Sequence, residues 1–141
     1  MPLFNSQLTS NSPLQMIAPG DPAGVVLFNA ETPANGQASI AVAIQPRTAS
    51  SGPTTVSLQF ECPLGLGAGV FQIQDSDGPT LTEASNFTSI NFGGGTPGQV
   101  VLANMNASGV SRVELQTAAR GLRVLCVTAP GNPITVRARQ Q

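Results

Sequence analysis

Short runs of alternating apolar and polar residues recur from residue 24 onward, and this period of two constrains the fold more than any other feature. In the run 55–61, Val56, Leu58 and Phe60 alternate with polar residues. Because successive side chains of a β-strand point to opposite faces, such a run predicts a strand with one buried and one solvated face. Alternating or short apolar runs occur at 24–29, 38–44, 55–61, 69–74, 86–92, 99–104, 111–117, 121–128 and 133–139.

Turn-forming segments separate these runs and leave little room for helices. The chain contains 15 glycines and 12 prolines in 141 residues, and no stretch of about ten residues free of them has a convincing helical period. Eight or nine short strands at this spacing predict an all-β fold, either an antiparallel β-sandwich with jelly-roll-like connections or a partly closed barrel. The length suits one domain, which we place at 23–141. Residues 1–22 are polar, punctuated by proline and aperiodic, and predict an extended N-terminal arm.

The run 121–128, "GLRVLCVT", is apolar on both faces. This pattern predicts either a central strand or a strand that packs against a partner subunit. Six phenylalanines are the only aromatic residues, a small supply for the core between two sheets. A sandwich with a modest core and several sheet edges needs those edges covered, and self-association is an economical way to cover them.

The chain lacks most side chains that catalyse reactions or hold metals. It has no histidine, which removes the usual proton shuttle and the commonest metal ligand. It also has no lysine, which excludes Schiff-base chemistry and a Walker-type phosphate loop. The start of the chain lacks the basic and apolar regions of a signal peptide, so we expect folding in a cytoplasm, with Cys62 and Cys126 buried and reduced. We therefore expect a protein that is not an enzyme and binds no cofactor.

Carboxylates cluster in "DSDGPTLTE" at Asp75, Asp77 and Glu83. They are weak candidates for an irregular calcium site, because the spacing is too short for a 12-residue EF-hand loop. An acid/base pair acting on a sugar is disfavoured, since the chain has no Trp or Tyr to stack on the ring. Asp-Gly at 77–78 is a strong signal for a type I′ turn. We therefore interpret this segment as the tight corner of a β-hairpin, with the strand ending near Asp75.

Positive charge is concentrated at the C-terminal end, although the whole chain has a net charge of −1. One acid, Glu114, lies among the arginines of this region. These arginines either occupy solvated outward positions on strands or form a basic face for an acidic partner. Nucleic-acid binding is disfavoured because no aromatic platform accompanies them. The candidate partner-binding arginines are Arg112, Arg120, Arg123, Arg137 and Arg139.

The order of these segments resembles a family of phage proteins. A polar arm precedes "TVSLQFECPLGLGAGVFQIQDSDGPTLTE", and a Gly-rich loop and the closing pair "AARGLRVLCVTAPGNPITVRAR" follow it. This arrangement resembles small β-sandwich virion proteins of tailed bacteriophages, of the capsid decoration or cement type, over roughly residues 54–139. The sequence departs from the pattern in lacking the aromatic residue that often follows the Asp-Gly turn.

The resemblance implies a structural protein on the surface of the virion head, assembled in the host cytoplasm and bound to the major capsid protein. It also implies self-association, with a homotrimer as the expected assembly, and no binding to nucleic acid or membrane. The arm would cross onto a neighbour or add a strand to its sheet. The alternative function is a carbohydrate- or receptor-binding β-sandwich of a phage tail or head fibre. The candidate contacts of the arm are Leu3, Phe4, Leu14 and Ile17.

Overall fold

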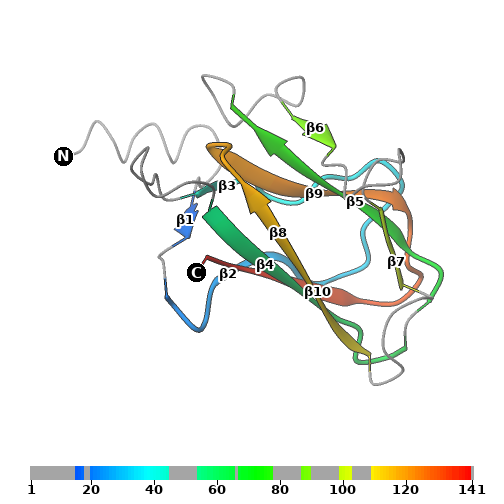
Figure 1. Ribbon diagram of the computed structural model, residues 1–141. Helices are drawn as coiled ribbons and strands as arrows, with labels where there is room; N and C mark the ends of the chain where they lie inside the picture. The colour runs from blue at the N-terminus through cyan, green and yellow to red at the C-terminus, as the bar shows by residue number, and fades with distance from the viewer. Residues whose placement is uncertain are drawn as a thin grey trace, which may run out of the picture.

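A computed structural model describes residues 15–17, 20–44, 54–65, 67–77, 87–89, 99–102 and 109–140. Over these residues the chain forms ten strands and no α-helix, and the strands lie in two sheets (Figure 1). The all-β, antiparallel sandwich predicted from the sequence is confirmed. None of the described segments is a helix of the length and hydropathy needed to cross a membrane.

The four-stranded sheet has the order β2-β10-β4-β8, and all its neighbours are antiparallel. Its strands are β2 (Val25–Glu31), β10 (Ile134–Gln140), β4 (Thr54–Glu61) and β8 (Val110–Thr117). The six-stranded sheet has the order β1-β3-β9-β5-β6, with β7 also paired to β5. Its strands are β1 (Gln15–Ile17), β3 (Val42–Ile44), β9 (Gly121–Thr128), β5 (Val70–Ser76), β6 (Thr88–Ser89) and β7 (Gln99–Val101).

From β2 to β10, the strands pair in a nested order: the first strand of this series pairs with the last, the second with the second to last, and so on. β2 pairs with β10, β3 with β9, β4 with β8, and β5 with both β6 and β7. The chain thus folds as one long doubled ribbon that wraps across the two sheets, which is the strand order of a jelly roll. The jelly-roll-like connections expected from the sequence are therefore present. β9, whose two apolar faces predicted a central or partner-facing strand, lies centrally between β3 and β5.

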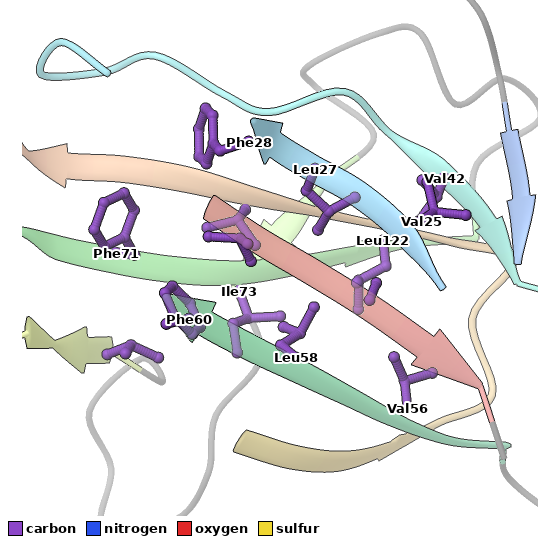
Figure 2. Packing of buried hydrophobic residues seen from close by; sticks show 14 of the residues in the cluster. Val25, Leu27, Phe28, Val42, Val56, Leu58, Phe60, Phe71, Ile73 and Leu122 are labelled. Carbon is purple, nitrogen blue, oxygen red and sulfur yellow. The ribbon is translucent and has the colours of Figure 1, made fainter. Parts of the chain in front are cut away.

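Alternating residues of the facing strands fill the space between the sheets. Val56, Leu58 and Phe60 of β4 are fully buried, as their spacing predicted. Phe71 of β5 lies between two rings of the opposite sheet, with centroids 6.2 Å from Phe28 and 5.8 Å from Phe60. Figure 2 shows these three rings together toward one end of the core. Three of the six phenylalanines thus meet at one contact between the sheets.

The first strand was not anticipated from the sequence. β1 pairs in parallel with β3, with Ile17 opposite Ile44, and the Ile17 side chain is 0% exposed. The arm was expected to lie outside the domain, but at Gln15–Ile17 it is an edge strand of the domain's own sheet. Three residues are too few to display a period of two, so this strand left no recognisable pattern.

The end of the strand expected near Asp75 agrees with the structure, in which β5 ends at Ser76. β5 and β6 are antiparallel neighbours, with Asp75 opposite Thr88. The tight turn expected at Asp77 and Gly78 cannot be assigned, because Gly78 lies outside the described residues. In the register of the two strands, that turn does not join Asp75 directly to its partner Thr88.

Candidate functional site

The outer surface of the four-stranded sheet carries three of the candidate arginines. Arg112 of β8 and Arg137 of β10 are both in register with Gln59 of β4, so the three side chains form one row across the sheet. Arg139 and Glu114 likewise flank Ser57 in the neighbouring row. Since the residues between them point into the core, these rows face outward.

Acidic partners balance most of the positive charge on this surface. Nε of Arg137 lies 2.8 Å from Oε2 of Glu61, which also accepts a hydrogen bond of 3.0 Å from Gln59. Nη2 of Arg112 lies 3.0 Å from Oε1 of Glu114, and both side chains are about half exposed. Exposed pairs of this kind contribute little to stability, typically about 0–1 kcal/mol. The surface therefore has mixed charge, and the strongly basic face considered from the sequence is not what the structure presents.

The other two arginines lie elsewhere. Arg120 lies in the turn between β8 and β9, where its backbone N–H donates to Ser76 and its carbonyl accepts from Ile44. Arg123 lies on β9, in the six-stranded sheet. The five arginines are thus divided between two sheets and a turn, and do not form one continuous binding face.

Arg123 is held within the outer layer of the six-stranded sheet. Its Nε donates a hydrogen bond of 2.8 Å to Oε1 of Gln74, the residue directly opposite on β5. Its guanidinium carbon lies 4.4 Å from the ring centroid of Phe87, a side chain that is only 7% exposed. Burial lowers the pKa of Arg123 from its ordinary value. These contacts indicate that Arg123 ties β9 to the β5–β6 edge, a structural role.

We expect Arg123→Ala to lower the free energy of unfolding by about 2 kcal/mol. The substitution leaves the buried Gln74 amide without its donor and removes the cation–π contact with Phe87. Equilibrium urea denaturation of the purified chain measures the change. The matched control is Arg139→Ala, at an exposed arginine, for which we expect a change within about 0.5 kcal/mol. Equal losses in the two variants would contradict the structural role of Arg123.

The candidate carboxylates do not converge among the described residues. Asp75 lies within β5, and its Oδ2 accepts a hydrogen bond of 2.9 Å from Oγ1 of Thr117 on β8. Asp77 follows the strand and is exposed, and Glu83 lies outside the described residues. Within the described part of the chain, no group of three or more Cys, Asp or Glu side chains could hold a metal ion. Asp75 instead links the two sheets, because β5 and β8 belong to different sheets.

Both cysteines are free and buried, as predicted. Burial raises the pKa of the Cys62 and Cys126 thiols above their ordinary values. A thiol with a raised pKa carries less of the thiolate form, which is the reactive nucleophile and metal ligand. These residues therefore act as small apolar core residues, and Cys126 contributes a weak contact of 3.8 Å to the carbonyl of Pro33.

Of the four candidate contacts of the arm, the structure describes one, Ile17. Ile17 is used by the chain's own core and is not available on the surface, which corrects its assignment as a partner contact. Leu3, Phe4 and Leu14 lie outside the described residues. Sequence reasoning also missed Gln74 and Thr117 as partners of Arg123 and Asp75. No local pattern marks them, because each pair is separated by more than 40 residues.

Comparison with known proteins adds no family to this description. No protein-family model matches the chain, and no curated protein is detectably similar to it in sequence.

Proposed function

We propose that this chain is a non-enzymatic structural protein of a bacteriophage virion, a capsid decoration or cement protein that binds the outside of the head. The observation that carries the proposal is the jelly-roll strand order, in which β2 pairs with β10 and each later strand pairs further inward. Jelly rolls are common in viral capsid proteins, and this support is an analogy at the level of fold.

The surface chemistry is compatible with this role. The outer row of Arg112, Gln59 and Arg137 presents long polar side chains with paired charges instead of a reactive cluster. Where opposite charges of a partner match exposed charges such as these, the match gives orientation and specificity more than strong affinity. Bound to the major capsid protein, the sandwich would stabilise the head by bridging neighbouring subunits.

Co-sedimentation with purified phage heads that lack their decoration layer tests the proposal. We expect the chain to sediment with the heads at saturable stoichiometry and to raise the temperature at which the heads break open. Absence of saturable binding would overturn the proposal. Binding to glycans or host receptors without binding to heads would instead support a receptor-binding fibre component, because jelly rolls also occur in lectins.

The structure also sharpens the test of the N-terminal arm. Deleting 1–22 removes β1 and the buried Ile17, so we expect a loss of stability of several kcal/mol, about what truncating a large core side chain costs. Deleting only 1–14 keeps β1, and this variant should sediment more weakly with heads if Leu3, Phe4 and Leu14 contact a neighbour. Undiminished sedimentation of the 1–14 deletion would contradict the role of the arm, and thermal denaturation of both variants provides the stability comparison.

A further inference from the structure

The sheet edge formed by β8 differs from the other described edges. At the edges of the six-stranded sheet, β1, β6 and β7 have three, two and three residues. β2, at the opposite edge of the four-stranded sheet, has seven residues but pairs with β10 through register shifts. Short strands and bulges are two ways in which proteins prevent edge strands from pairing with other chains. These three short strands and β2 are thus protected.

β8 has neither form of protection. It has eight residues and pairs with β4 in one uninterrupted register from Val110 to Thr117. It contains no proline, and among the described strands it pairs with β4 alone, so it forms the outer border of the four-stranded sheet (Figure 1). A long, regular edge of this kind offers its main-chain N–H and C=O groups to another strand.

The charged residues of β8 are complementary to a second copy of the same strand. If a second copy of β8 pairs antiparallel about Val113, then Arg112 lies directly opposite Glu114 of the second copy, and Glu114 lies opposite Arg112 of the second copy. Both side chains lie on the outer face and are exposed, at 57% for Arg112 and 47% for Glu114. Opposite charges in directly facing positions stabilise a strand pair, whereas like charges destabilise it.

The apolar residues of β8 fit the same register. Val113 is partly buried against the core, and it would lie beside Val113 of the second copy at the twofold axis. Val110, 45% exposed, would lie opposite Gln116 of the second copy. The pairing covers apolar surface that the isolated chain leaves in water, which favours association.

We propose that β8 is a self-association edge, at which two copies of the chain pair antiparallel about Val113 and join their four-stranded sheets into one continuous sheet. The contact is isologous, because the same residues serve both copies. It therefore supports a dimer, or an assembly of dimers, and differs from the trimer expected from the sequence. The inference does not depend on the proposed binding to phage heads.

Charge variants of the full chain test the register. Arg112→Glu places like charges opposite one another in the pair, and so does Glu114→Arg. In sedimentation velocity across a concentration series we expect the wild type to dimerise, and each single variant to associate at least about tenfold more weakly. A mixture of the two variants restores both opposite-charge pairs between chains, so we expect it to form heterodimers. Neither variant restores the Arg112–Glu114 pair within its own chain, so recovery in the mixture reports contact between chains.

Two controls complete the test. The double variant R112E/E114R exchanges the charges and should dimerise like the wild type. Arg139→Glu changes the net charge as Arg112→Glu does, but it lies on the inner strand β10 and should leave dimerisation unchanged. A wild type that stays monomeric at all concentrations would overturn the proposal. So would single variants that associate as tightly as the wild type, or a mixture that fails to associate.

Discussion

Phe71→Ala is expected to lower the free energy of unfolding by about 3–5 kcal/mol, the cost of truncating a large buried aromatic side chain. Phe71 is 0% exposed and belongs to the six-stranded sheet, whereas its ring neighbours Phe28 and Phe60 belong to the four-stranded sheet. The substitution leaves a cavity between the sheets and removes two aromatic contacts, each typically contributing about 0.5–1.5 kcal/mol beyond burial. Domains of this size have a total stability of only about 5–15 kcal/mol, so a large part of it would be lost.

Equilibrium urea denaturation measures this effect, provided that the variant and the wild type have the same dependence of unfolding free energy on urea concentration. Phe71→Leu, which retains most of the volume, should cost roughly 1–2 kcal/mol and remain folded if the alanine variant does not. The control is Leu64→Ala at a side chain that is 71% exposed, with an expected change within about 0.5 kcal/mol. A loss below about 1 kcal/mol for Phe71→Ala would show that this ring does not join the sheets as described.

Gly24→Ala is expected to lower the free energy of unfolding by about 3 kcal/mol or more. Gly24 has φ +65°, a left-handed conformation that costs a residue with a Cβ atom roughly 1–2 kcal/mol. An added Cβ would also clash with the carbonyl oxygen of Ala138. Ala138 belongs to β10, which pairs with β2 on one side and β4 on the other, so this oxygen cannot move without disturbing both pairings.

Gly36→Ala separates the two contributions to this loss. Gly36 has φ +82°, but nothing lies within 4 Å of an added Cβ. We therefore expect only the conformational cost there, roughly 1–2 kcal/mol. The difference between the two variants in thermal or urea denaturation measures the close approach of β2 to β10. Equal losses would mean that the chain near Gly24 accommodates the methyl group.

The elements that the sequence identified are those with a repeated local pattern. The alternation in 55–61 located β4 within one residue and assigned Val56, Leu58 and Phe60 to the core. The apolar run 121–128 located β9 and predicted either a central or a partner-facing strand, and β9 is central in its sheet. β1 was missed because three residues show no period. The Asp-Gly signal reports only a local turn preference and did not indicate that Asp75 pairs with Thr88.

The candidate site was predicted less well, since surface residues carry no periodic signal of their partners. The five arginines are close in the sequence, which suggested one basic face. In the fold, Arg123 lies on one sheet and contacts Gln74 and Phe87, while Arg137 lies on the other sheet and pairs with Glu61. Proximity along the chain does not determine which sheet a strand joins.

The sequence by itself determined that the chain is all-β, where most strands lie and which of their faces are buried, because the two-residue period of a strand is a property of consecutive residues. It also determined that Cys62 and Cys126 are small buried residues in a chain without histidine or lysine. Only the tertiary structure decided that the strands pair in a nested order and that β8 forms a long edge of its sheet. It also decided that Asp75 accepts a hydrogen bond from Thr117 of the other sheet. These features depend on pairing between segments far apart in the chain, where many registers satisfy the same alternation and packing of the whole core selects one.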